Sequence, residues 1–114
     1  MRDPVLRVVP RPADLNLNGN IFGGWILAQM DVAGGVVATQ RANGPVATVA
    51  IDAMKFLRPI LVGDLISVYA GIARVGRTSI AVEMTVTARR LGVDDEITVT
   101  EGIFTYVAVD ARTR

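Results

Sequence analysis

The stretch Ile21–Thr39, IFGGWILAQMDVAGGVVAT, decides the fold of this chain. It is longer than an ordinary strand and nearly every residue in it is apolar or small, so the pattern predicts one long helix over 21–39. Because apolar residues lie on all sides of this helix, we expect it to be buried on every side. The pair Gly34-Gly35 weakens a helix, so we expect these glycines to permit close packing. The run is marginal in length for a bilayer and has Asp31 near its centre, which disfavours a membrane span.

The segments around this helix have the patterns of strands. Short apolar or alternating runs predict strands over 5–9, 46–56, 65–75, 78–90 and 97–109. The alternation is clearest in 78–90, where one face carries Ile80, Val82, Met84, Val86 and Ala88. The later strands are joined by short turns, which connect antiparallel neighbours. The order of elements predicts an α+β fold in which a five-stranded antiparallel sheet wraps around one central helix.

Length and composition limit the kind of protein that this chain can be. Its 114 residues fit one domain, which we expect to span 1–114. The hydrophobic fraction is 51%, which is high for a small isolated domain, so we expect self-association into an oligomer. The net charge of +1 gives no reason to expect nucleic acid or an anionic membrane as a partner.

Cysteine and histidine are both absent from the chain. The first absence excludes disulfides, thiolate metal sites and a cysteine nucleophile. The second excludes Ser-His-Asp hydrolases, histidine-ligated zinc enzymes and histidine-dependent dehydratases. Any chemistry must therefore use carboxylates, amides, hydroxyls, backbone dipoles or arginine, and we expect no metal and no cofactor. The opening residues 1–5 lack the apolar core of a signal peptide, so we expect a cytoplasmic location.

Asp31 is the strongest candidate for a catalytic residue. It is the only charged side chain between Asp14 and Arg41. An ionised carboxylate among apolar residues is costly unless it is paired or hydrogen-bonded, and such groups gather at functional sites. The alternatives are a structural aspartate that pairs with an arginine of a second copy, or one that projects from a kink near Gly34.

A loop rich in asparagine and glycine, NGNIFGG at 18–24, leads into the start of the predicted helix. The free N–H groups there, with Gly23 and Gly24 allowing close approach, suit an anion or a developing oxyanion, and Asn20 adds an amide. An ordinary capping loop is the alternative. Asp31 follows these glycines by about 10–12 Å along the helix axis. That is too far for one substrate atom, but a symmetric dimer could bring the glycines of one copy to Asp31 of the other.

Basic residues on and between the predicted strands form a third candidate site. The turn Gly76-Arg77-Thr78-Ser79 offers a flexible backbone, a guanidinium and two hydroxyls, which together suit a phosphate. On these residues alone, an ordinary solvated hairpin is the favoured interpretation. Further basic side chains in this half of the chain are Lys55, Arg58, Arg74, Arg89 and Arg90.

Taken together, these motifs resemble those of one family. The segment 18–31, NGNIFGGWILAQMD, is similar to the signature of the hot-dog-fold acyl-CoA thioesterases, particularly the bacterial YciA type and the cytosolic acyl-CoA hydrolases. The resemblance continues in order through MKFLRP (54–59), VGD (62–64), GRTS (76–79) and FTYVAVD (104–110). It therefore covers almost the whole chain.

This resemblance implies a hot-dog fold and hydrolysis of acyl-CoA to a free acid and coenzyme A at a dimer interface, without a metal. Asp31 matches the family's catalytic carboxylate, as nucleophile or general base. Gly23 and Gly24 match the carbonyl-polarising helix start, and Asn20 holds a position where many YciA-type chains have Asp. Coenzyme A contacts are implied for Lys55, Phe56, Leu57, Arg58, Gly76, Arg77, Thr78 and Ser79. Family members are commonly dimers assembled into hexamers.

Two other functions fit parts of the pattern. A non-catalytic acyl-CoA-binding hot-dog module would keep the same fold, but a pure binder gains nothing from a carboxylate near a thioester. A hot-dog hydratase or dehydratase generally depends on a catalytic histidine, and this chain has none. Both therefore rank below the thioesterase.

Overall fold

The computed structural model describes residues 3–110 of the chain. Its elements, in chain order, are β1 (Leu6–Val8), the 3-10 helix η1 (Pro12–Asp14), α1 (Gly23–Ala42), β2 (Val46–Phe56), β3 (Leu65–Val75), β4 (Ser79–Arg89) and β5 (Ile97–Ala108). The predicted helix and five strands are confirmed, whereas η1 was not predicted. Helix α1 begins and ends later in the chain than predicted, because Phe22 is still extended and the left-handed residue that ends the helix is Asn43.

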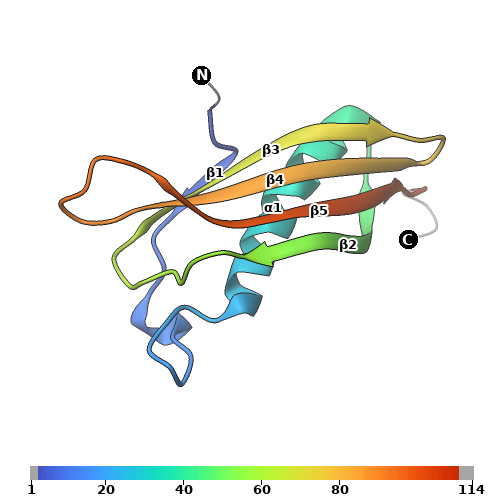
Figure 1. Ribbon diagram of the computed structural model, residues 1–114. Coiled ribbons are helices and arrows are strands. Elements are labelled where there is room, and N and C mark those ends of the chain that lie inside the picture. The colour runs from blue at the N-terminus through green and yellow to red at the C-terminus, as the bar shows by residue number, and fades with distance from the viewer. Residues whose placement is uncertain (1–2, 111–114) are drawn as a thin grey trace.

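The five strands form one antiparallel sheet in the order β1-β3-β4-β5-β2. Strands β1 and β2 are the two edges, and α1 connects them by crossing one face of the sheet (Figure 1). Strand β2 pairs only with β5, although the two are separated in the chain by β3 and β4. The edge strand β2 can therefore join the sheet only after β5 has formed.

The core lies between α1 and the face of the sheet that carries the alternating residues of β4. The predicted face of β4 is confirmed, since Val82, Val86 and Ala88 are fully buried. The prediction that α1 is buried on every side is wrong for the single chain, because a single sheet can cover only one side of a helix. On the other side, Val32 is 58% exposed and Val36 is 45% exposed. None of the helices in residues 3–110 is long and apolar enough to cross a membrane.

Helix α1 approaches the sheet closely at Gly34. A Cβ atom at this position would overlap the hydroxyl group of Tyr106 and would lie 3.0 Å from Cε of Met84. A Cβ atom at Gly35 would meet only open space. The expected close packing is therefore confirmed for the first glycine of the pair and is wrong for the second, which lies on the side of α1 that the sheet does not cover.

The edge strand β2 is irregular at two places. Its pairing with β5 shifts between Thr48 and Ala50 and again between Asp52 and Lys55, and Ala53 has a φ of 52° in the left-handed region. This strand also exposes apolar side chains beside α1. We call four of the exposed apolar side chains of these two elements the α1–β2 surface, namely Val32, Val36, Val49 and Ile51.

A buried ion pair ties the connection after β2 to the end of β4. Asp64 is 2% exposed, and its Oδ1 lies 3.4 Å from Nε of Arg90. Its Oδ2 accepts a hydrogen bond of 2.9 Å from the backbone N–H of Leu61. Arg90 in turn donates from Nη2 to the carbonyl oxygen of Pro59 at 2.7 Å. The 59–64 segment is therefore fixed to the sheet by charge as well as by packing.

Candidate active site

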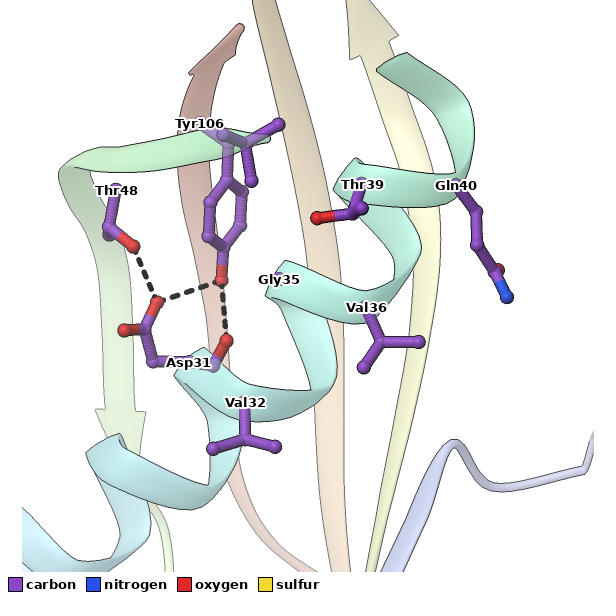
Figure 2. Close-up of a pocket in the computed structure, with 9 residues that line it drawn as sticks. Asp31, Val32, Gly35, Val36, Thr39, Gln40, Thr48 and Tyr106 are labelled. Carbon is purple, nitrogen blue, oxygen red and sulfur yellow. Dashed lines mark hydrogen bonds between the residues drawn. The ribbon is translucent and has the colours of Figure 1, made fainter. Parts of the chain in front are cut away.

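Asp31 lies about two turns into α1, on the side of the helix that faces β2. Its Oδ1 accepts a hydrogen bond of 2.7 Å from Oγ1 of Thr48 and one of 3.0 Å from the hydroxyl of Tyr106 (Figure 2). The same Tyr106 hydroxyl lies 3.2 Å from the main-chain oxygen of Asp31. Thr48 and Tyr106 are cross-strand partners on β2 and β5. Two neighbouring strands therefore present two hydroxyls to one carboxylate oxygen.

The second carboxylate oxygen, Oδ2, is left free. It accepts no hydrogen bond from the described residues, and it points away from both hydroxyls in Figure 2. Within residues 3–110 no arginine or lysine lies within ion-pair distance of Asp31, so the described chain offers the carboxylate no internal salt bridge. The side chain is half-buried. It lines a pocket of about 520 Å³ together with residues from one side of α1 and from the strands beside it, namely Val32, Gly35, Val36, Thr39, Gln40, Val46, Thr48 and Tyr106.

Tyr106 serves as a hydrogen-bond donor in this arrangement. Its side chain is 1% exposed. Burial first, and then the hydrogen bond and the negative charge of Asp31, raise the pKa of the Tyr106 phenol well above its usual value. The phenol therefore keeps its proton over the whole neutral range.

The glycine loop lies at the start of α1, as predicted. Asn16 holds the loop together, because its Oδ1 accepts from the backbone N–H of Asn20 at 3.1 Å and its own N–H donates to the Asn20 carbonyl at 2.6 Å. No side chain caps the helix. Among the described residues, the N–H groups of Gly23 and Gly24 find no acceptor. These two amides are free to polarise a carbonyl group.

Some of the predicted binding residues gather around this helix start. A second pocket, of about 350 Å³, is lined by Asn20 and Gly23 together with Asn16, Ile21, Ile26 and residues 56–60. The ring of Phe56 lies over Gly23, with Cε1 3.6 Å from where a Cβ atom of Gly23 would be. Gly24 lies beside the ring of Phe22, outside the lining of this pocket. Lys55 is exposed, and its cross-strand neighbour on β5 is Glu101. Because successive side chains of a strand alternate, Lys55 points to the opposite face of β2 from Phe56.

The other predicted binding residues lie at the far end of α1. A third pocket, of about 410 Å³, is lined by residues 75–80 and Ala108 together with Arg41 and Ala42 from the last turn of the helix. It includes the whole predicted group, Gly76, Arg77, Thr78 and Ser79. The three pockets share no lining residue. Within one chain, Asp31, the glycine loop and the arginine-bearing turn therefore occupy separate cavities.

Sequence reasoning did not include Thr48 and Tyr106 among the site residues. The available signal was a phenol on the inward face of the last strand, alternating with the buried Phe104. The Thr48 hydroxyl lies on the inward face of β2. The register shift after Thr48 interrupts the alternation, so the sequence pattern does not indicate which face this side chain occupies. Within residues 3–110, no cluster of acidic side chains could hold a metal ion.

Comparison with known proteins places the chain among thioesterases. The model of the thioesterase superfamily matches residues 18–94. The acyl-CoA thioester hydrolase YciA of Escherichia coli is 42% identical over 111 residues, which cover 95% of this chain and 84% of that protein. A hexameric hotdog fold thioesterase of Campylobacter jejuni matches with a TM-score of 0.92 and 42% identity, over 97% of this chain and 86% of that one. An aspartate-to-alanine mutant of a hexameric broad specificity acyl-coenzyme A thioesterase matches with a TM-score of 0.92 and 40% identity, over 98% and 83% of the two chains.

Proposed function

This chain belongs to the thioesterase superfamily and has the hot-dog fold, and from that premise we propose that it hydrolyses acyl-CoA thioesters to a free acid and coenzyme A. The observation that carries the proposal is the carboxylate of Asp31. It is held by two neutral hydroxyls, faces no cation in the described chain, and keeps one free oxygen beside a pocket. An oxygen in that state can take a proton from water.

In the proposed reaction, Asp31 removes a proton from a water molecule while the water oxygen attacks the thioester carbonyl carbon. The new C–O bond makes a tetrahedral oxyanion, which the Gly23 and Gly24 amides of a second copy stabilise. The C–S bond then breaks, and the proton held by Asp31 passes to the departing sulfur. In the nucleophilic alternative, Asp31 itself attacks the carbonyl carbon, and the C–S bond breaks with release of the coenzyme A thiolate. Water then hydrolyses the resulting mixed anhydride to the free acid and regenerates Asp31, and the proton from water passes to the thiolate. The base contributes about 10²–10⁴-fold and an oxyanion donor about 10²–10³-fold.

Two chains are needed to build this site. In one chain Asp31 and Gly23 line different pockets, whereas the α1–β2 surface beside Asp31 is apolar and exposed. We therefore place a two-fold dimer contact on that surface, with hexamers built from such dimers. The hexameric state described for the Campylobacter jejuni thioesterase supports this assembly.

Coenzyme A is the substrate's carrier group in this proposal, and no metal ion or other cofactor takes part. Arginine binds phosphate in a two-pronged geometry, so we assign the phosphate contacts to Arg58 beside the glycine loop, and to the 76–79 turn with Arg41. Lys55 lies on the opposite face of β2 and outside the lining of the glycine-loop pocket, so it could reach the substrate only from another direction. Asn20 holds the attacking water or the carbonyl. Since acyl-CoA esters are metabolites of the cytoplasm, we place the protein there.

The proposal is tested by turnover of Asp31→Asn and Asp31→Ala on a panel of acyl-CoA esters, with free thiol as the readout. We expect kcat to fall by about 10²–10⁴-fold, with the folded state and the oligomer mass unchanged. Asp94→Asn, which removes an exposed carboxylate in the β4–β5 hairpin, is the matched control and should turn over like wild type. Wild-type rates in either Asp31 variant would refute the assignment, and binding of acyl-CoA without turnover by the wild type would identify a non-catalytic module.

The two-chain site has its own test at the first residue of α1. Proline is well tolerated at that position, and Phe22 before it is already extended, so Gly23→Pro removes one N–H group with little other change. Gly23→Ala keeps the N–H group and is the control. We expect Gly23→Pro to lose about 10²–10³-fold in kcat. Mixed oligomers of Gly23→Pro and Asp31→Asn chains should recover about a quarter of wild-type activity, because half of the random dimers contain one complete site. No recovery would mean that each chain works alone.

A further inference from the structure

We infer that Tyr106 is a positioning residue which, together with Thr48, fixes the carboxylate of Asp31 so that Oδ2 is the oxygen that reacts. The inference rests on the proposed function, since it assigns an orientation to the group that performs the hydrolysis. Its observation is independent of that function: both hydrogen bonds to the Asp31 side chain end on Oδ1.

Tyr106 restrains the aspartate more strongly than a single hydrogen bond would. Its hydroxyl lies 3.0 Å from Oδ1 of Asp31 and 3.2 Å from the main-chain oxygen of the same residue. The phenol therefore contacts both the side chain and the backbone of one helical turn. Because it is fully buried and stays protonated at neutral pH, it donates at all times.

The position of the phenol is itself fixed by packing. Gly34, three residues after Asp31 and on the next turn of α1, leaves room for the Tyr106 hydroxyl that any side chain would fill. The end of Met84 lies against the same place. The hydroxyl thus fits between helix and sheet with little freedom to move, which is what a group that orients another requires.

Thr48 completes the restraint from the other side of the carboxylate. Its Oγ1 lies on the edge strand, next to Tyr106 in the sheet, and donates to Oδ1 at 2.7 Å. A free aspartate can rotate about its last bond and exchange its two oxygens. Rotation out of this orientation breaks both hydrogen bonds, so one oxygen stays held by the two hydroxyls and the other keeps no donor from the described chain (Figure 2). Small losses of such alignment cost large factors in rate.

The decisive variant is Tyr106→Phe, which removes one hydroxyl from a buried ring. Its matched control is Tyr69→Phe. Tyr69 is also buried, at 8% exposure, and its hydroxyl also binds a carboxylate, lying 3.0 Å from each oxygen of Glu96. It lies on the face of the sheet away from α1, since its cross-strand partner is Thr85 and not a core residue. The two variants therefore lose similar interactions in different places.

We expect Tyr106→Phe to lower kcat by about 10- to 100-fold, with KM changed by less than about twofold because the buried hydroxyl is directed at Asp31. Thr48→Val should also lower kcat, whereas Thr48→Ser, which keeps the hydroxyl, should restore it to near the wild-type value. Tyr69→Phe should keep the wild-type kcat with a similar loss in melting temperature. This split separates positioning from a general loss of stability.

Three results would overturn the inference while leaving the proposed function in place. They are a wild-type kcat in Tyr106→Phe, an equal fall in both tyrosine variants, or a rise in KM alone. All three are read beside Asp31→Asn, whose loss of turnover tests the proposed function separately. A crystal structure of Tyr106→Phe gives a readout that needs no turnover: the Asp31 carboxylate should rotate or occupy more than one conformation. An unmoved carboxylate would overturn the inference whatever the activity.

Discussion

Replacing Gly34 by alanine should weaken both the fold and the site. The added methyl group would overlap the Tyr106 hydroxyl, lie 3.0 Å from Cε of Met84 and lie 3.1 Å from Cε1 of Tyr106. Overpacking of this kind costs about 1–3 kcal/mol. Alanine also raises helix propensity by about 1 kcal/mol over glycine. The net loss for Gly34→Ala is therefore about 0–2 kcal/mol, and it combines a packing cost with a gain in helix propensity.

Gly35→Ala is the control that isolates the packing cost. It sits one residue later in the same helix, so it gains the same helix propensity, but its new methyl group meets only open space. The propensity term cancels between the two variants, and we expect Gly34→Ala to be less stable than Gly35→Ala by about 1–3 kcal/mol. Denaturant unfolding followed by the fluorescence of Trp25, the single and nearly buried tryptophan, measures the difference. Both variants are compared at one protomer concentration, because association contributes to stability.

Turnover supplies the second half of the test. To accept the methyl group, the phenol of Tyr106 has to move away from α1, which lengthens its bonds to Asp31. We therefore expect kcat of Gly34→Ala to fall by about tenfold or more. Equal stability of the two alanine variants would show that the sheet yields without cost, and the packing argument would then be refuted.

Three further predictions concern the ion pair, the buried phenol and the edge strand. Arg90→Met should cost about 3 kcal/mol in chemical denaturation, because it leaves the charge of the buried Asp64 without its cation, whereas the exposed neighbour Arg89→Met should stay within about 0.5 kcal/mol of wild type. Since the folded pKa of Tyr106 is raised, the unfolded chain loses this proton first. Stability should then fall above about pH 10 by up to about 1.4 kcal/mol per pH unit, and denaturant midpoints in Tyr106→Phe should lack this part of the fall. Ala53→Gly should raise the free energy of unfolding by about 0.5 kcal/mol, because φ at Ala53 is 52° and glycine adopts the left-handed region without strain. A denaturant midpoint below that of wild type would contradict this prediction.

The strands could be predicted from the sequence because each is a short apolar or alternating run, a pattern that depends only on neighbouring residues. The inward face of β4 is an example, since Val82 and Val86 are buried as their spacing requires. The burial of α1 could not be predicted in the same way. A uniformly apolar helix does not indicate which side meets the sheet, so Gly34 and Gly35 look alike in sequence although only the first is packed.

For the candidate site, too, the local sequence predicted one residue but not the residues that contact it. Asp31 could be singled out because it is the lone charge in an apolar run. Its hydrogen-bond partners come from strands 17 and 75 residues away, and their register depends on a bulge in β2. The residues near Asp31 in the sequence therefore do not indicate that Thr48 and Tyr106 contact it. The assignments of Asn20, Gly23, Gly24 and the coenzyme A contacts remain predictions.

The position of β5 between β4 and β2 should determine when the nascent chain completes its site. Asp31 precedes Tyr106 by 75 residues in the chain, and among the described strands β2 pairs only with β5, which follows β3 and β4. A nascent or truncated chain that lacks β5 cannot pair β2 with the sheet. Its apolar helix α1 is less covered, and its Asp31 carboxylate lacks the hydrogen bond from Tyr106. We therefore expect turnover to begin only after β5 has been translated and has paired with β2, and we expect a chain cut before β5 to have no activity.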